Sequence, residues 1–163
     1  MKAIITVKGI GSMTAELYPE KAPETVKNFV ALAKDGFYEG LIFHRVISGF
    51  MIQGGGFDES FSQKRAKAIK GEFRSNGFAG NDIRHTRGVL SMARTSDPDS
   101  ASSQFFIMHA DAPHLDGAYA AFGRVTEGLE VIDAVASVKV GNYGYFSDVP
   151  VDPVVIESVK ITD

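Results

Sequence analysis

Apolar and polar positions alternate along several short runs of the chain, a pattern typical of β-strands that bury one face. Residues 2–7 (KAIITV) and 13–18 (MTAELY) are β-branched or alternating, and Gly9 and Gly11 lie between them, which indicates a hairpin. Further strand-like runs occupy residues 42–47, 50–54, 87–93, 104–108, 119–125 and 154–161. The pattern therefore predicts a protein built mainly from short strands.

Two segments repeat their apolar residues at helical spacing instead. Residues 23–34 (PETVKNFVALAK) carry one apolar stripe, formed by Val26, Phe29, Val30 and Ala33. Pro23 suits the first helical position, and Gly36 marks the exit. A second helix is predicted at 127–137, with Thr126 as its cap. Many short strands with two helices that do not alternate as βαβ units predict an antiparallel barrel or sandwich.

Length and composition favour one globular domain. The chain has 163 residues and no repeat or linker-like run, so residues 1–163 are expected to form a single domain. Hydrophobic residues make up 44% and charged residues 23%, which is average usage for globular proteins. The net charge of −3 provides no basic field for nucleic acid or for an anionic membrane surface.

Targeting segments and cysteine chemistry are not indicated. No apolar run reaches the ~20 residues that a membrane span needs. The N-terminal apolar run is short and is broken by Lys8, so it predicts a strand rather than a signal peptide. The chain has no cysteine, which excludes disulfides, thiolate zinc sites and cysteine nucleophiles. This composition is compatible with the reducing cytoplasm, which is the expected compartment.

The stretch FHRVISGFMIQGGG (residues 43–56) places an arginine and a glutamine in a run that otherwise looks like core strand. Alternation predicts that Phe43 and Arg45 share one face of their strand, and that Met51 and Gln53 share one face of the next. Arginine is almost never buried without a partner. An apolar surface with a few directed donors suits a neutral, partly apolar ligand. The alternative is that Arg45 is an ordinary exposed strand residue whose stem covers apolar surface.

The other candidate motifs do not indicate a specific function. The four histidines have no paired metal-ligand spacing, so a structural or surface role is expected for His44, His85, His109 and His114. Residues 54–56 (GGG) lack the Gly-Lys-Ser/Thr ending of a phosphate loop and instead suit a tight turn or a close backbone approach. No serine lies in a G-x-S-x-G elbow, which argues against a hydrolase. Residues 57–84 are rich in charge and glycine and predict a long surface loop.

Three motifs together resemble the cyclophilin family of peptidyl-prolyl isomerases. They are FHRVISGFMIQGGG, GVLSMARTSDPDSASSQFFIM at 88–108 and LDGAYAAFGR at 115–124, and the likeness runs from KAPETVKNF to VIESVKI. The absence of cysteine and the sequence MART are similar to the bacterial cytosolic branch. The resemblance implies a mostly β fold, a closed eight-stranded antiparallel β-barrel capped by two α-helices. Side chains fill the interior of such a small barrel, so the ligand surface is expected on its outside.

The resemblance also implies roles for individual residues. Arg45 would donate a hydrogen bond to the prolyl nitrogen of the twisted amide, and Gln53 would hydrogen-bond the substrate backbone. Gln104 would help orient Arg45 and the substrate. The pocket for the proline ring would consist of Phe50, Met51, Phe106 and Leu115. Ala93 and Arg94 would present main-chain N–H and C=O groups to an extended peptide. Phe122 would pack beneath the pocket. The alternative for the apolar members is plain barrel core.

The chain departs from the family pattern in HLDGAY at 114–119, where many members have Trp-Leu-Asp-Gly-Lys-His. His114 stands where a tryptophan often helps to bind cyclosporin, so weak cyclosporin binding is expected. Tyr119 replaces a pocket histidine, and its ring and hydroxyl can still line the pocket. Arg94 replaces an asparagine, a change that leaves its main-chain role intact.

The resulting expectation is an enzyme that isomerises X-Pro bonds in peptides and in unfolded or folding proteins, without a metal or other cofactor. A peptide-binding, chaperone-like module with little turnover is the main alternative, and a structural subunit of a larger complex is a third. Retention of Arg45 favours turnover, because binding alone does not require an arginine at the amide. A monomer is expected, since the sequence shows no obvious dimer patch.

Overall fold

The computed structural model describes all residues from Met1 to Asp163. Two α-helices, α1 (Pro23–Lys34) and α2 (Leu129–Ala136), and two short 3₁₀ turns, η1 (Arg74–Asn76) and η2 (Pro113–Leu115), accompany ten strands. The strands are β1 (Lys2–Val7), β2 (Gly11–Leu17), β3 (Arg45–Ile47), β4 (Met51–Gly54), β5 (Val89–Met92), β6 (Phe105–Met108), β7 (Ala121–Glu127), β8 (Val140–Tyr143), β9 (Phe146–Pro150) and β10 (Ile156–Thr162). The mostly β fold with two helices is thereby confirmed.

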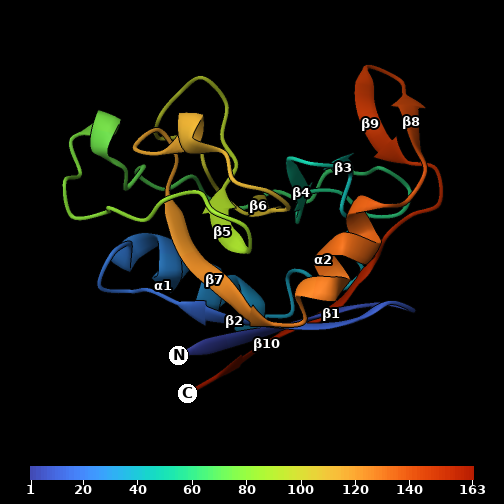
Figure 1. Ribbon diagram of the computed structural model, residues 1–163, viewed down its shortest axis with the longest axis horizontal. Helices are drawn as coiled ribbons and strands as arrows, with labels where there is room; N and C mark the ends of the chain where they lie inside the picture. The colour runs from blue at the N-terminus through green and yellow to red at the C-terminus, as the bar shows by residue number, and fades with distance from the viewer.

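Eight of the strands form one antiparallel, strongly curved sheet in the order β10-β1-β2-β7-β5-β6-β4-β3 (Figure 1). Its outermost strands, β10 and β3, do not pair with each other, so the predicted closure of the barrel is not confirmed. β3 is only three residues long and pairs with β4 alone. The gap is bridged by main-chain bonds between residues 40–43 and residues 154–156, including the Phe43 N–H to the Val154 carbonyl (2.9 Å).

Helix α1 begins and ends where its sequence predicts, and its buried stripe enters the core. Its first turn has no local side-chain cap. Instead the carboxylate of Glu72 accepts hydrogen bonds from the Thr25 N–H (2.7 Å), the Thr25 hydroxyl (2.7 Å) and the Glu24 N–H (3.2 Å). A negative charge at a helix N-terminus is stabilising. The prediction that 57–84 is purely a surface loop is therefore wrong around Glu72, where the loop folds inward to cap α1.

Helix α2 is shorter at its N-terminus than the sequence predicts. It begins at Leu129, with Gly128 at the cap in a left-handed conformation (φ 86°). The predicted cap, Thr126, lies in β7, and its hydroxyl donates to the Thr14 carbonyl (3.3 Å) on β2. A Cβ at position 128 would lie 2.4 Å from the Ser12 carbonyl oxygen, so glycine permits both the turn and the close approach to β2.

The strands of the sheet carry two separate apolar clusters, one on each face. The inner face and both helices bury the main core, whose aromatic centre is formed by Phe29, Tyr38, Phe43, Phe105 and Phe122. The outer cluster consists of Met51, Val89, Phe106, Met108, Ala112, Leu115 and Ala121. Along β6 the residues alternate between them, because Phe105 and Ile107 face inward while Phe106 and Met108 face outward. An apolar cluster therefore covers the outer face of the sheet where β4, β5, β6 and the start of β7 lie.

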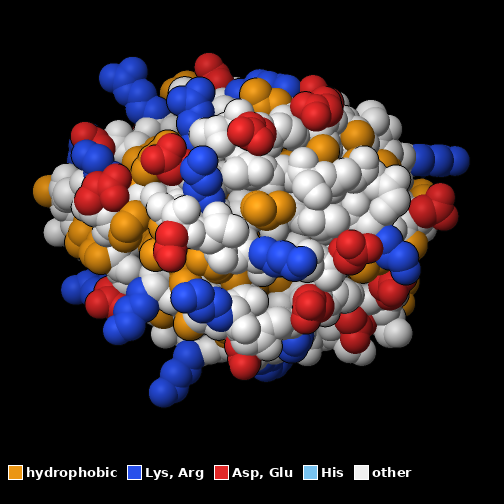
Figure 2. Space-filling view, turned by 90° about the horizontal axis from the view of Figure 1, so that it is seen from below, with side chains coloured by type: hydrophobic (Ala, Val, Ile, Leu, Met, Phe, Trp, Pro, Cys, Tyr) orange, Lys and Arg blue, Asp and Glu red, His pale blue; other side chains and the backbone are white.

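The hairpin β8–β9 is not predicted from the sequence. It forms a separate two-stranded sheet that projects beyond β3 (Figure 1). Most of its residues are exposed, so its strands lack the alternation between buried and exposed positions that marks a half-buried strand. Figure 2 views the molecule from the side of β10, β1 and β2, where acidic and basic side chains are interspersed. No large patch of one sign covers this face.

Candidate functional site

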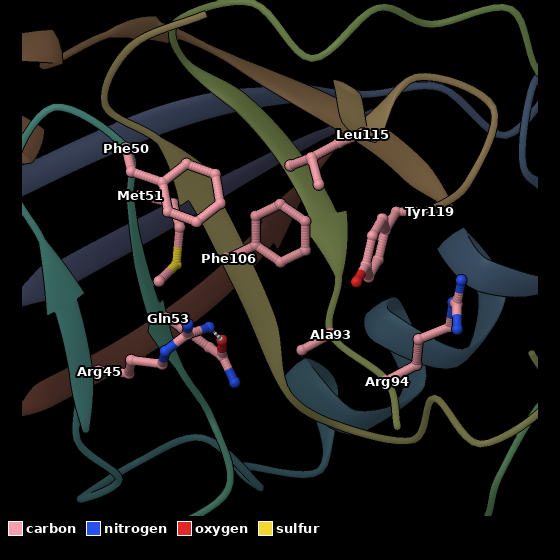
Figure 3. A pocket seen from close by; sticks show the side chains of 9 residues that line it. All are labelled: Arg45, Phe50, Met51, Gln53, Ala93, Arg94, Phe106, Leu115 and Tyr119. Atoms are coloured by element: carbon pink, nitrogen blue, oxygen red, sulfur yellow. Dashed lines mark hydrogen bonds between the residues drawn. The ribbon is translucent and has the colours of Figure 1, made fainter. Parts of the chain in front are cut away.

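A shallow hollow lies over the outer cluster, and we call it the central hollow. Nine residues from four parts of the chain line it, namely Arg45, Phe50, Met51, Gln53, Ala93, Arg94, Phe106, Leu115 and Tyr119 (Figure 3). Arg45 and Gln53 stand on one side of the hollow, Tyr119 and Arg94 stand on the other, and Phe106 lies between them. Nine of the eleven residues proposed as catalytic or substrate-binding from the sequence thus meet in one place.

The polar side of the central hollow is a chain of three side chains. Arg45 and Gln53 are paired neighbours on β3 and β4, and an Nη1–H of Arg45 donates to Gln53 Oε1 (3.3 Å). Gln53 Nε2 in turn donates to Gln104 Oε1 (3.1 Å). Gly56 leaves room for this arrangement, because a Cβ there would lie 2.5 Å from the Gln104 side chain. The Arg45 guanidinium is exposed and keeps most of its five N–H donors free.

The opposite rim holds Arg94 between two aromatic rings. Its guanidinium lies 4.9 Å from the Phe73 ring centre and 4.6 Å from that of Tyr119, and Nη2 donates to the Ala118 carbonyl (2.8 Å). The Tyr119 ring meets Phe106 edge to face at 5.7 Å. Stacking on both faces fixes the orientation of these side chains. Tyr119 therefore lines the hollow as expected.

The main chain at residues 93–94 is only partly available to a ligand. The Ala93 N–H donates to the Gln104 carbonyl (3.0 Å) and is therefore already paired within the protein. The Ala93 carbonyl and the N–H and C=O of Arg94 have no hydrogen-bond partner within the protein. These three groups remain able to pair with an extended peptide.

Two of the expected site residues do not line the central hollow. Phe122 is fully buried in the main core, where its ring lies 5.0 Å from that of Phe29. Its neighbour Ala121 takes the position in the outer cluster, because alternation along β7 turns Phe122 inward. Gln104 stands behind Gln53 and reaches the hollow only through it. The exposed His114 stacks on Phe50 (5.8 Å between ring centres) at the rim.

The predicted faces of the first strand are also corrected. Phe43 is completely buried in the main core and Arg45 is exposed, so these two residues do not share a face. Residues 40–43 pair with residues 154–156, and β3 starts only at Arg45, so alternation does not extend back to Phe43. Met51 and Gln53 do face the same hollow, as predicted.

His85 supports the central hollow from beneath, a role that the sequence does not reveal. Its ring is buried and stacks on Phe106 at 6.0 Å. Nδ1 lies 3.1 Å from the Asp116 carboxylate and Nε2 lies 2.8 Å from the Ser91 hydroxyl. Burial lowers the pKa of His85, although the hydrogen bond to the Asp116 carboxylate opposes this shift. The two hydrogen bonds thus hold the imidazole in a fixed orientation, in which it packs against the ring of Phe106.

Comparison with known proteins agrees with the geometry. The profile of the family described as "Cyclophilin type peptidyl-prolyl cis-trans isomerase/CLD" matches residues 2–161. The chain belongs to the cyclophilin family. It is a peptidyl-prolyl cis-trans isomerase.

Curated bacterial relatives are similar over nearly the whole of this cyclophilin. A peptidyl-prolyl cis-trans isomerase of Acinetobacter baylyi is 50% identical over 93% of this chain and 81% of its own length. Peptidyl-prolyl cis-trans isomerase B of Escherichia coli is 43% identical, over 94% and 95% respectively. A solved Cryptosporidium parvum cyclophilin superimposes with a TM-score of 0.85 at 29% identity, covering 100% of this chain and 99% of its own. Neither helix of this cyclophilin has the length and apolar character to cross a membrane.

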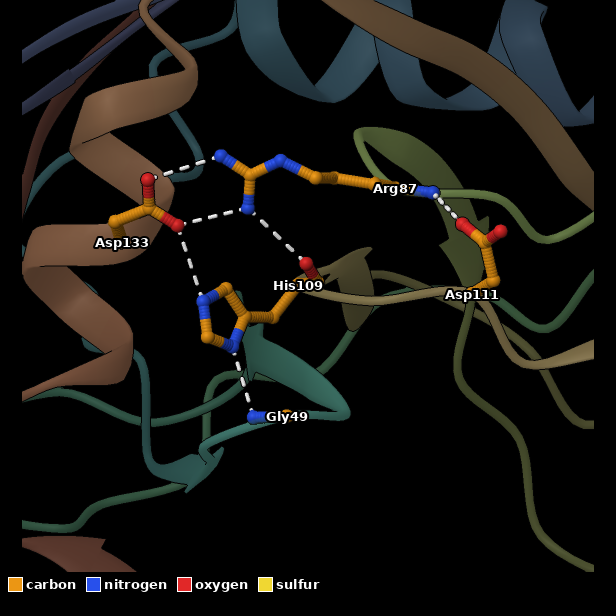
Figure 4. A network of polar contacts seen from close by, with 5 residues as sticks. All are labelled: Gly49, Arg87, His109, Asp111 and Asp133. Atoms are coloured by element: carbon orange, nitrogen blue, oxygen red, sulfur yellow. Dashed lines mark hydrogen bonds and ion pairs between the residues drawn. The ribbon is translucent and has the colours of Figure 1, made fainter.

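A polar network fixes the turn that carries Phe50 (Figure 4). His109 Nδ1 accepts a hydrogen bond from the Gly49 N–H (2.8 Å), and its Nε2 lies 3.0 Å from the Asp133 carboxylate on α2. Arg87 donates two hydrogen bonds to Asp133 (2.7 and 2.9 Å) and one to the His109 carbonyl (3.1 Å). These bonds hold the pKa of Asp133 below its usual range, with the Arg87 hydrogen bond as the largest cause. The network ties the turn at 48–50 to α2.

Proposed function

We propose that Arg45 is the catalytic residue of this cyclophilin and that the central hollow binds the proline ring of an X-Pro substrate. Rotation about a peptide bond costs about 18–20 kcal/mol because it breaks amide resonance. As the amide twists, the lone pair localises on the prolyl nitrogen, which then accepts a hydrogen bond. A donor at that position binds the twisted state better than either planar state, and this preference is what accelerates a reaction.

The free N–H groups of Arg45 beside an apolar hollow are the observation that supports this proposal. The guanidinium is permanently charged, so its hydrogen bond to the prolyl nitrogen is worth about 1.5–3 kcal/mol. A ~10⁵-fold acceleration requires about 7 kcal/mol. Arg45 therefore supplies part of the effect. The remainder comes from holding the peptide in a fixed geometry and from removing water around the amide.

The other lining residues divide these tasks. Phe50, Met51, Phe106 and Leu115 bury the proline ring, and Gln53 hydrogen-bonds the substrate backbone. The hydrogen bond from Gln53 to Gln104 restricts the rotamers of Gln53. The unpaired main-chain groups at 93–94 hold the extended peptide. His85, buried under Phe106, keeps the floor of the hollow rigid.

Proline-containing peptides and unfolded or folding proteins are the proposed substrates. The C. parvum cyclophilin similar to this chain was crystallised in the presence of the dipeptide Ala-Pro. We further propose that the protein acts as a monomer in the cytoplasm and binds cyclosporin weakly, because His114 offers a smaller ring than tryptophan at the rim. Sedimentation at micromolar concentration tests the monomer, since a concentration-dependent mass contradicts it.

The test is NMR exchange of a short X-Pro peptide with wild-type protein, Arg45→Ala and Arg45→Lys. Loss of the guanidinium is expected to lower kcat/KM by about 10- to 150-fold. Lysine keeps the charge without the planar fork, so an intermediate rate is expected. Arg124→Ala is the matched control, because Arg124 is exposed on β7 outside the hollow and its loss should leave the rate unchanged. Peptide binding without acceleration by the wild type would instead indicate a recognition module.

A further inference from the structure

The hairpin β8–β9 displays an unusual number of apolar side chains to solvent. Five of the seven large hydrophobic residues that are exposed in the whole chain lie on it or directly after it, namely Val140, Tyr143, Tyr145, Phe146 and Val151. Tyr145, at the tip, is fully exposed and buries none of its ring. Single exposed apolar residues are ordinary, but a concentration of them on one projecting element marks an interaction surface.

This aromatic surface borders a second hollow, which we call the hairpin hollow. Three aromatic residues line it, Phe57, Tyr145 and Phe146, and we call them the aromatic wall. The other lining residues are polar, namely His44, Arg45, Gln53, Gln104 and Ser147. Arg45 and Gln53 therefore line both the central hollow and the hairpin hollow. The hairpin hollow, at about 340 Å³, has more than twice the volume of the central hollow, at about 140 Å³. A peptide bound at Arg45 has a larger hollow next to its proline.

Phe57 and Phe146, two of the three residues of the aromatic wall, are fixed before any ligand arrives. Phe146 packs on Phe57 at 5.4 Å and on Phe61 at 5.0 Å, and Phe61 stacks on Tyr143 at 4.5 Å. Aromatic pairs of this kind stabilise a structure by more than the burial of their apolar area alone. These two packed rings lose little side-chain entropy on binding, which favours affinity.

The wall is also uncharged at neutral pH. The nearly buried His44 also lines the hollow, with its ring 4.7 Å from that of Phe57, and its Nδ1 has no hydrogen-bond partner. Burial, together with the neighbouring charge of Arg45, lowers the pKa of His44 to about 4. Arg45 is then the sole charge that lines the hairpin hollow. Aromatic rings next to a single arginine suit an aromatic or large apolar side chain more than a charged one.

We propose that the hairpin hollow is a specificity subsite that binds an aromatic side chain of the substrate peptide, on the Arg45 side of the proline. This inference rests on the proposed function of the central hollow. An extended chain advances about 3.3 Å per residue, so the side chain belongs to one of the ~3 residues next to the proline on that side. Tyr145 closes over the aromatic ring and Phe146 packs against it.

The experiment measures kcat/KM by NMR exchange for peptides in which Phe or Ala occupies each of the three positions before and after an X-Pro bond. For wild-type protein, kcat/KM is expected to be about fivefold higher for the Phe peptide than for the Ala peptide, because part of the ring is buried. This preference should occur at one position, or at neighbouring positions, on one side of the proline. In Tyr145→Ser this ratio is expected to fall below about twofold. The fully exposed Tyr145 makes no packing contact that the substitution could remove.

Val151→Ser is the matched control, because Val151 is exposed beside the same hairpin but does not line the hairpin hollow. It should keep the wild-type ratio. A ratio near one at every position in the wild type, a ratio unchanged in Tyr145→Ser, or an equal fall in Val151→Ser would each overturn the subsite. The Ala peptides separate the two proposals: if the wild type fails to isomerise them and the Phe peptides alike, the proposed function of the central hollow fails.

Discussion

The imidazole of His109 accepts a hydrogen bond from the Gly49 N–H, and the main-chain N–H of His109 donates to the carbonyl of the next residue, Phe50 (2.9 Å). His109 therefore holds the main chain on both sides of the Gly49–Phe50 peptide bond, in the turn that positions a wall of the central hollow. Because Nδ1 accepts, the ring proton must lie on Nε2, where Asp133 accepts it. His109, which directly follows β6, thus positions the Phe50 ring although it does not itself line the central hollow.

Substitution of His109 should therefore affect substrate binding more than chemistry. His109→Ala leaves the Gly49 N–H without its partner, and we expect a KM raised about 3- to 10-fold with kcat nearly unchanged, since one hydrogen bond of about 1 kcal/mol is lost. His109→Gln offers an amide oxygen to Gly49 and should restore most of the affinity. Kinetics together with the ring resonances of Phe50 check this. An unshifted Phe50 resonance in His109→Ala would contradict the positioning role.

Acid should destabilise the protein through His44. Its pKa is about 4 in the folded protein, from burial and the charge of Arg45, against an unfolded value of 6.5. Between these values the unfolded state binds more protons, so the stability present above pH 6.5 is lost as pH falls towards 4. The expected loss is about 3 kcal/mol. Urea unfolding from pH 7 to pH 4 measures it, and His44→Leu should show a shallower slope over this window. Parallel slopes would mean that His44 does not control the loss.

Removal of the Glu72 carboxylate should weaken α1. Glu72→Ala leaves the Thr25 N–H and hydroxyl without their shared acceptor in a buried place. The expected loss is about 1–3 kcal/mol in the free energy of unfolding. Urea denaturation measures this loss. Glu59→Ala, an exposed change in the same loop, is the control and should leave the stability within about 0.5 kcal/mol of wild type. Equal stability of the two variants would exclude a capping role.

Cyclosporin affinity should rise when a larger ring is placed at the rim. His114 is exposed and already stacks on Phe50, so a tryptophan can extend the same apolar surface without entering the core. His114→Trp is expected to tighten cyclosporin binding by about tenfold or more, from the additional apolar area buried. Titration calorimetry compares the two proteins. An affinity unchanged by the substitution would place the cause of weak binding elsewhere, and tight binding by the wild type would contradict the expectation itself.

The pattern of apolar and polar residues correctly predicts the elements that are determined by residues close together in the sequence. Helix α1 has its predicted bounds, because its stripe and its proline start are both encoded within twelve residues. Alternation along β4 correctly places Met51 and Gln53 together. It fails at Phe43, since the residues before β3 pair with a segment over a hundred positions away. The cap of α1 by Glu72 and the support of Phe106 by His85 also depend on distant contacts, so no window of sequence contains them.

The resemblance to the cyclophilin family, and not periodicity, predicts which residues line the central hollow. Alternation marks Met51 and Phe106 as members of a strand face, but it cannot state whether that face is core or binding surface. The hairpin β8–β9 illustrates the converse limit. Its aromatic residues face solvent and the loop at 57–61 rather than the main core, so the rule that apolar residues lie inside gives no strand pattern there.

Strands β4 and β6 contribute alternate residues to the main core and to the outer cluster. Substitutions that alter stability and substitutions that alter the central hollow therefore fall at different positions. A change at Ile52 or Phe105 acts on the main core, whereas a change at Met51 or Phe106 acts on the outer cluster and the central hollow that it lines. Selection for new sequence preference can therefore proceed on one set of positions while the other keeps the chain folded. A library confined to the outer positions should yield folded members with altered preference at a far higher frequency than one confined to the inner positions.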